Sequence, residues 1–286
     1  MFKALPYHLR FGCGFGSKAK IIVILVVGKP FQLGIFPRTL MRTANRVIEI
    51  ICKGAVINVE GVKFGIRDMA SYYVCLPIHE PWMWNYLKPK EGDIFLDVGA
   101  HIGRYALLVA KMVGDSGKVL AIEPDPINFS ILRENIELNK FHNVIALNIA
   151  AWSNETKLEF FLGEGSAHGS VKKTYADKLH GPRHGYMKVS ARPLDTVISE
   201  IGLGEISYIK IDVEGAEFEA LKGLEQTLKK NSPRLIVEVL EENIDKVKEY
   251  VSGLGYETEV IWEGYHVDPP HVYMMFEKRP NKKIER

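Results

Sequence analysis

The chain has 286 residues, of which 47% are hydrophobic and 25% are charged, and its formal net charge is only +2. This composition excludes a disordered or fibrous chain, and the length allows one α/β domain with an appendage. The three cysteines, Cys13, Cys52 and Cys75, are far apart and odd in number. They support neither a disulfide framework nor a zinc site, and they favour a reduced, cytoplasmic setting.

Basic charge is concentrated at the N-terminal end. Residues 1–54 carry nine Lys or Arg side chains and one Glu, so this segment has a net charge of +8 and the remainder has −6. The segment is therefore a separate electrostatic unit. We divide the chain into a basic extension at 1–54, a hairpin and helix leading into the core at 55–90, and a main domain at 91–286.

The extension contains three notable stretches. The glycine-rich run Phe11 to Lys18 is expected to be flexible, and Ile21 to Val27 is expected to be a buried strand or helix too short to span a membrane. Arg38 to Lys53 has aliphatic side chains on one helical face and arginines on another. Such a basic amphipathic helix is expected to pack on the domain, and the alternative is peripheral docking on an anionic membrane or an acidic partner.

The segment from 55 to 90 is predicted to hold a hairpin and a short aromatic helix. Ala55 to Ile66 alternates around a Glu-Gly pair, which is typical of a hairpin turn. Ile78 to Leu87 is expected to begin a helix with Pro81 in its first turn, and it gathers three aromatic residues. Core packing is the default for these residues. Alternatively, Glu80 and the aromatics cover a ligand of the main domain.

The main domain begins with a strand, a glycine turn and a helix. Ile94 to Val98 predicts a short buried strand, and Arg104 to Val113 predicts a helix. Between them, Gly99 and Gly103 let the backbone pass close to a ligand, and the helix start offers N–H groups. Glu123 ends the next strand, at about the interval where a carboxylate binds ribose hydroxyls in βαβ nucleotide sites. The pattern therefore predicts a nucleoside site.

The residue that ends the first strand narrows the choice of nucleoside. A dinucleotide site would have Gly-x-Gly-x-x-Gly, whereas this turn is Asp97-x-Gly99-x-x-x-Gly103. A carboxylate at this position suits a ligand with an ammonium group and a sulfonium. The turn is similar to motif I of the class I S-adenosylmethionine (SAM) methyltransferases. Taken alone, it also fits a tight strand-to-helix turn of any α/β domain.

A second group of acids follows a later strand. Asp212 and Glu214 come directly after the buried run Ser207 to Ile211, at the carboxyl end where open parallel sheets bind ligands. Glu217 and Glu219 are better explained as N-terminal charges of a helix from Glu217 to Leu228. Because crowded carboxylates are costly unless they serve a site, we expect Asp212 and Glu214 to be functional.

The remaining elements complete a mostly parallel sheet. They are a helix ending at Asn139, a third strand from Val144 to Ala150, a Gly- and His-rich excursion from Ala151 to Ala191, a helix from Pro193, a strand from Leu235 to Leu240, a helix from Ile244 to Val251, and a closing antiparallel pair, Thr258 to Trp262 with Val272 to Phe276. This order predicts a Rossmann-like, doubly wound α/β sheet of seven strands with a terminal hairpin. The excursion is expected to cover the substrate.

Three motifs together resemble the FkbM family of SAM-dependent methyltransferases. They are Asp97-Val98-Gly99-Ala100-His101-Ile102-Gly103, Ile122-Glu123-Pro124 and Ile209-Lys210-Ile211-Asp212-Val213-Glu214-Gly215-Ala216-Glu217. The resemblance covers roughly Glu80 to Tyr256, and the last motif is the most specific. It implies methyl transfer from SAM to a hydroxyl of a sugar, glycan, lipid or other small natural product. Two positions depart from the family: His101 replaces the usual Asn, and no histidine follows Glu238.

The resemblance also implies a cofactor site. Gly99 and Gly103 would shape the methionine pocket, Asp97 would face the ammonium group, and Glu123 would accept the ribose hydroxyls. The segment from Asn148 to Ala151 would border the adenine. The expected cofactor-binding residues are Glu80, Asp97, Gly99, Ala100, Gly103, Glu123, Pro124, Asn148, Ala150, Ala151 and Asp212.

The acceptor hydroxyl must lose its proton during transfer. Asp212 or Glu214 could accept this proton directly, and His101 is the next candidate. The two carboxylates could instead hold a divalent cation that acidifies the hydroxyl, although no metal-ligand motif supports one. Two other functions remain open. One is RNA methylation, with the basic extension binding phosphates, and the other is a membrane-docked SAM-binding scaffold without catalysis.

Overall fold

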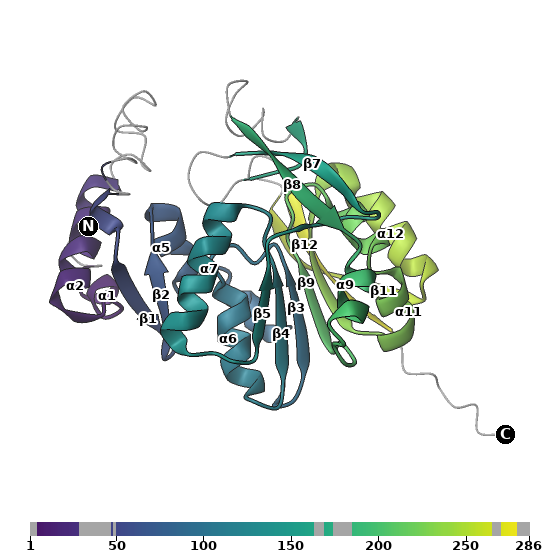
Figure 1. Cartoon of the computed structure of the whole chain (residues 1–286), viewed down its shortest axis with the longest axis horizontal. Coiled ribbons are helices and arrows are strands. Elements are labelled where there is room, and N and C mark those ends of the chain that lie inside the picture. Colours follow the sequence, from purple (N-terminus) through teal and green to yellow (C-terminus); the bar gives the residue numbers. More distant parts are fainter. Residues whose placement is uncertain are drawn as a thin grey trace.

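The computed structural model describes residues 5–28, 47, 50–162, 169–173, 185–264 and 270–278. A sheet of seven strands forms its centre, in the order β11-β12-β10-β9-β3-β4-β5 (Figure 1). The strands are β3 Ile94–Val98, β4 Lys118–Ile122, β5 Val144–Leu147, β9 Tyr208–Ile211, β10 Arg234–Leu240, β11 Tyr256–Gly264 and β12 His271–Lys278. β12 runs antiparallel to both β10 and β11, whereas the other neighbours are parallel. The predicted fold class is therefore confirmed.

Helices cover both faces of this sheet, because the strands bury side chains on both. The helices are α6 Arg104–Val113, α7 Pro126–Asn139, α9 Leu194–Glu200, α10 Glu217–Lys222, α11 Glu225–Asn231 and α12 Ile244–Gly253. Within β3, Phe95 joins one buried cluster, and Leu96 and Val98 join the other. This alternation follows from the two-residue period of a strand. Because both faces of these central strands are buried, their sequences are mostly apolar and do not alternate with polar residues.

The order in which the chain adds strands to the sheet changes side at β3. From β3 the chain order runs through β4 to β5 on one side, and β9 and β10 lie on the other. Ligands of open α/β sheets bind at such a switch point, outside the carboxyl ends of the strands. The fold thus brings the ends of β3, β4 and β9 to one place.

The described residues among the first ninety form a layer beside α6 and α7. They contain α1 Leu5–Leu9, α2 Gly14–Val23, the π-helical turn η2 Ile24–Gly28, β1 Ala55–Val59, β2 Val62–Ile66, α5 Met69–Cys75 and the 3₁₀ helix η3 Pro81–Asn85. β1 and β2 pair in the predicted hairpin. Figure 1 shows the hairpin between α2 and α7. Asparagine side chains join hairpin and helix, since Gly65 N donates to Asn135 Oδ1 at 2.7 Å and Lys63 N donates to Asn139 Oδ1 at 2.8 Å.

Several local predictions were wrong. Residues 11–18 do not form a flexible loop, because Gly14 begins α2 and Ser17 is buried against the hairpin. The third strand ends at Leu147, and Ala150 instead pairs with Ala191 in a separate small sheet. That sheet consists of β6 Ala150–Ala151, β7 Thr156–Phe161 and β8 Tyr186–Arg192. The helix expected after Ile78 is reduced to η3, one short 3₁₀ segment.

The helix predicted from Glu217 to Leu228 is two helices, α10 and α11, with a break at Gly223. A Cβ atom at Gly223 would lie 2.2 Å from the carbonyl oxygen of Trp152, so the backbones meet there. The new helix is capped by Asp195 of α9, whose carboxylate accepts from Gln226 N at 2.8 Å and Thr227 N at 2.9 Å. These contacts come from distant sequence, which is why local periodicity did not show the break.

Two predictions fall mainly outside the described residues. Of the proposed basic helix at 38–53, only residues 47 and 50–53 are described, and of the excursion, 163–168 and 174–184 are not. Within the described ranges, no helix is long and apolar enough to cross a membrane.

Candidate functional site

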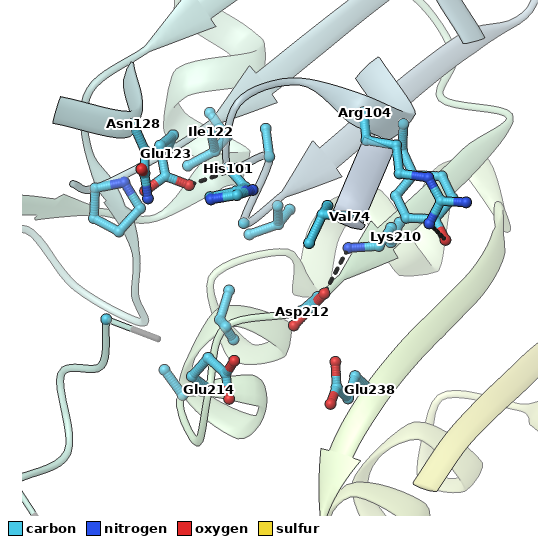
Figure 2. Close-up of a pocket in the computed structure, with 18 of the residues that line it drawn as sticks. Val74, His101, Arg104, Ile122, Glu123, Asn128, Lys210, Asp212, Glu214 and Glu238 are labelled. Atoms are coloured by element: carbon cyan, nitrogen blue, oxygen red, sulfur yellow. Dashed lines mark hydrogen bonds and ion pairs between the residues drawn. The ribbon is translucent and has the colours of Figure 1, made fainter. Parts of the chain in front are cut away.

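A cavity of about 490 Å³ lies over the carboxyl ends of β3, β4 and β9. Its walls also include α5, through Tyr73 and Val74, and the small sheet, through Ala150 and Phe160. Among the side chains labelled in Figure 2, Glu123, Asn128 and His101 lie together on one side, and Lys210, Asp212 and Glu238 lie together on the other. The cavity therefore has two chemically different ends.

The glycine turn after β3 brings two backbone segments into contact. Gly99 has φ +85°, and a Cβ atom there would lie 1.8 Å from the carbonyl oxygen of Asp212. The turn then continues to Gly103, which has φ +96° and starts α6; a Cβ atom there would lie 2.1 Å from Leu107 Cδ1. Gly99 thus lets the β3 and β9 loops form one wall, and Gly103 seats the helix beneath it.

Glu123 is held rigidly at the end of β4. Its carboxylate accepts from the backbone N–H of His101 at 2.7 Å and from that of Asp125 at 2.9 Å. The loop behind it is fixed by Asn148, whose side-chain amide donates to the carbonyls of Glu123 and Pro124 at 2.8 and 2.9 Å. Burial raises the pKa of Glu123 to about 8, although both backbone donors oppose this rise. An acceptor of hydrogen bonds is thus positioned before any ligand arrives.

A buried lysine lies between the ends of β3 and β9. Lys210 is 2% exposed, and its Nζ lies 3.0 Å from Asp212 Oδ2 and 3.9 Å from Asp97 Oδ1. Burial raises the pKa of Asp97 to about 6, and the lysine opposes that rise. Burial also acts to raise the pKa of Asp212, but Lys210 and a hydrogen bond from Glu238 together hold it below its usual value. Asp212 is therefore an ionised carboxylate with an ammonium behind it.

Carboxylates and tyrosines surround Asp212 on the side of β10 and β12. Burial, together with the negative charge of Asp212, raises the pKa of Glu238 well above its usual value. Glu238 in its protonated form can then donate to Asp212. The Tyr273 hydroxyl lies 2.8 Å from Glu238 Oε2 and also donates to Glu80. His271 Nε2 lies 3.2 Å from Glu238 Oε1. This end of the cavity can accept, share and pass on protons.

The structure brings most of the predicted site residues to this cavity. Those that line it are Glu80, Gly99, Ala100, His101, Glu123, Pro124, Ala150, Ala151, Asp212 and Glu214. Among the described residues, the three predicted members that do not line the cavity are Asp97, Gly103 and Asn148. Asp97 lies behind Lys210, and the other two support the turn and the Glu123 loop. These three residues therefore lie behind the cavity wall and do not form its surface.

Sequence reasoning missed several polar residues of the cavity. They are His79, Arg104, Tyr105, Lys210, Glu238, His271 and Tyr273. For Lys210 a signal existed, because a lysine between two isoleucines of a buried strand requires a partner. Glu238 gave the same signal between two valines. No sequence signal pointed to Tyr273 or His271, because they reach the cavity only through the pairing of β12 with β10. In the described part of the chain, no group of three or more His, Cys, Asp or Glu side chains is arranged to hold a metal ion.

Comparison with known proteins identifies the family. The profile of the methyltransferase FkbM domain matches residues 97–258, more than half of the chain. The chain belongs to the FkbM methyltransferase family. The matched region runs from Asp97, within β3, to the first residues of β11, and so contains both the glycine turn and Asp212. This FkbM-family protein is a methyltransferase with a Rossmann-like fold.

Individual relatives are distant. Methyltransferase sdnD of Sordaria araneosa is 29% identical over 190 residues, covering 57% of this chain and 72% of that protein. The 31-O-demethyl-FK506 methyltransferase FkbM of Streptomyces tacrolimicus is 27% identical over 161 residues, covering 48% and 61%. The crystal structure of methyltransferase FkbM from Methylobacillus flagellatus superposes with a TM-score of 0.50 at 16% identity, covering 96% of this chain and 58% of the other. That structural likeness supports the fold alone.

Proposed function

We propose that this protein transfers the methyl group of SAM to a hydroxyl of a sugar, glycan or other small natural product. The observation that supports the proposal is that one cavity holds a hydrogen-bond acceptor at one end and an ionised carboxylate at the other. A rigidly held Glu123 lies at one end, and the ionised Asp212 lies at the other, beside the glycine turn. The relative from Streptomyces tacrolimicus is named a 31-O-demethyl-FK506 methyltransferase, which supports oxygen as the atom that accepts the methyl group.

The residues at the first end fit the nucleoside part of SAM. Glu123 offers acceptor oxygens for a ribose diol, and the small side chains of Ala150 and Ala151 leave a flat wall for the adenine. The close approach permitted by Gly99 gives the methionine part a backbone-lined path toward Asp212. Glu80 and Arg104, 3.6 Å apart, lie where a carboxylate and an ammonium could be bound together.

The residues at the second end can prepare an acceptor hydroxyl. SAM, when bound, supplies an electrophilic methyl group. Asp212 would accept the hydrogen bond of the acceptor hydroxyl, orient its oxygen, and receive its proton as the methyl group passes from the sulfonium sulfur of SAM to that oxygen, leaving a neutral thioether. Lys210 holds Asp212 in its ionised form until that moment, and the β9–β3 contact keeps its position fixed. The tyrosines and Glu238 continue the hydrogen-bond network away from the reacting oxygen.

Isothermal calorimetry with SAM tests the cofactor site. We expect saturable binding to the wild-type protein and a loss of at least about 2 kcal/mol of binding free energy in Glu123→Ala, because a charge-assisted acceptor of two hydroxyls is removed. Glu137→Ala is the matched control, since that glutamate is 72% exposed on α7. Equal affinities in the two variants would remove Glu123 from the site, and no binding to wild type would overturn the cofactor assignment.

Transfer of radiolabel from SAM to a panel of sugars and glycosides tests the chemistry. Asp212→Asn should lower turnover by about 10²- to 10⁴-fold, the range contributed by a positioned proton acceptor. Its affinity for SAM should stay within a few-fold of wild type. If binding and turnover fall together, Asp212 belongs to the cofactor site. If the label enters RNA in preference to every sugar, the acceptor class is wrong.

A further inference from the structure

The helix α2 presents an apolar face to solvent. Phe15 is 90% exposed, Ile22 is 38% exposed, and Val26 in the following π-helical turn is 47% exposed. Phe15 and Ile22 are seven residues apart and Val26 follows after four more, so the three side chains lie along one side of the helix. Phe15 has the largest exposed fraction among the large apolar side chains of the described residues. We call Phe15, Ile22 and Val26 the α2 face.

The opposite side of the same helix is fixed to the fold. Ile21 and Ile24 are completely buried in the core cluster. The Ser17 hydroxyl accepts from Val56 N at 3.1 Å, and Cys13 N donates to the Val56 carbonyl at 2.9 Å. The helix is therefore apolar on both sides but needs only one of them for its own packing. The apolar side chains on its outer side are thus free to contact an apolar surface outside this fold.

Basic side chains lie on α2 and next to it in the chain. Lys18 is exposed on α2 itself, and Arg10 is exposed at the end of α1. Lys20 donates to the carbonyl of Lys53, which places the chain around Lys53 beside α2, and Ile50 in that chain is 76% exposed. This is the part of the protein whose net charge is +8, against −6 elsewhere. The α2 face thus combines exposed apolar side chains with one exposed lysine, Lys18, on the same helix and an exposed arginine, Arg10, just before it in the chain.

We propose that the α2 face docks this protein on the surface of an anionic lipid bilayer. Apolar side chains entering the headgroup region and basic residues beside them are the two contributions that interfacial helices combine. The continuous helix formed by α2 and η2 runs only from Gly14 to Gly28, which is shorter than the roughly 20 residues needed to cross a bilayer, so it would lie along the surface. A second copy of this chain is a poorer occupant, because the exposed Lys18 and Arg10 of one copy would meet the same positive charges of the other. The docking face is separate from the cavity and does not depend on the proposed reaction.

Vesicle co-sedimentation of the full chain tests this proposal. The vesicles are phosphatidylcholine alone and phosphatidylcholine with phosphatidylglycerol. We expect binding to the anionic vesicles that weakens with added salt, and little binding to the neutral ones. The variant Phe15→Ser/Ile22→Ser should bind the anionic vesicles at least about tenfold more weakly. Lys18→Gln should bind about fivefold more weakly, because one basic residue near the surface is lost.

The matched control is Met112→Ser/Ile127→Ser, which removes two apolar side chains, each 43% exposed, from α6 and α7. It should bind as wild type does. Thermal unfolding by circular dichroism establishes that both double variants are folded. Absence of binding to anionic vesicles overturns the proposal, as does equal binding of the two double variants. If sedimentation velocity shows a dimer that only Phe15→Ser/Ile22→Ser dissociates, with vesicle binding unchanged, the occupant is a second copy and the proposal is wrong.

Discussion

At the scale of single residues, the site is shaped by burial of charge. Glu123 and Lys210 are both almost completely buried, yet each has a fixed set of partners from the strand ends. Because burial disfavours a charged form, the partners decide which groups remain ionised. Glu123 has only neutral backbone donors and its pKa rises to about 8, whereas Asp212 has an ammonium and its pKa falls. The carboxyl groups at the two ends of the cavity therefore lose their protons in different pH ranges, Asp212 at low pH and Glu123 only near pH 8.

SAM affinity should depend on pH through Glu123. In the free protein its pKa is about 8, so the carboxyl group is mostly protonated at neutral pH. Ribose hydroxyls donate to the ionised form, and binding below pH 8 therefore includes the cost of deprotonation. The dissociation constant measured by calorimetry should fall by up to about tenfold per pH unit as pH rises toward 8, and level off above it. Glu123→Gln should give a much flatter profile. A flat wild-type profile would contradict this account.

Replacing Lys210 should destabilise the whole domain. Lys210→Met leaves the carboxylates of Asp97 and Asp212 without their buried cation. We expect the free energy of unfolding in urea to fall by about 3–5 kcal/mol, the cost of breaking a buried ion pair on one side. Lys118→Met, an exposed lysine at the start of β4, is the control and should change little. Adding Asp97→Asn to Lys210→Met should restore part of the loss, and failure to do so would show that charge is not the cause.

At the scale of elements, prediction succeeded where one stretch of sequence determines its own structure. The strand, glycine turn and helix around Gly99 and the hairpin of β1 and β2 are such stretches, because turn residues and periodicity lie within a few positions. It failed where a distant backbone decides, as at Gly223 beside Trp152. The same division applies to the site. The places of Asp212 and Glu123 beside the cavity were predicted from the ends of their strands. Tyr273 was not predicted, because it reaches the cavity only through the position of β12 in the sheet.

The start of α11 is capped by a residue of α9, and replacing that residue tests how much this contact between distant segments stabilises the fold. Asp195 accepts from the backbone N–H groups of Gln226 and Thr227 and from the Thr227 hydroxyl, at 2.6 to 2.9 Å. Asp195→Ala should lower the free energy of unfolding by about 1–3 kcal/mol, since helix donors lose their acceptor. The affinity for SAM should not change. Asp245→Ala, an exposed acid in the first turn of α12, should have a much smaller effect on urea unfolding.

At the scale of the whole molecule, charge and packing divide the chain differently. Charge sets residues 1–54 apart from the remainder. Packing does not, because a single buried cluster contains Phe11 and Ile21 of the extension together with Phe64 of the hairpin and Phe95 of β3. The predicted boundaries at residues 54 and 90 thus fall within a shared core. We infer that the described parts of the extension, residues 5–28 and 50–54, fold together with the main domain.

Two adjacent isoleucines of α2 differ in their environment: one packs in the shared core and the other lies on the α2 face. Ile21 is fully buried in the shared core and Ile22 is 38% exposed. Ile21→Ala should lower the free energy of unfolding of the entire protein by about 2–4 kcal/mol, and Ile22→Ala by much less, because only the first creates a cavity. Far-UV circular dichroism and tryptophan fluorescence should report the same urea midpoint for each variant, since all four tryptophans lie beyond residue 80. Two separate transitions, with fluorescence unmoved by Ile21→Ala, would show instead that the extension is an independent unit.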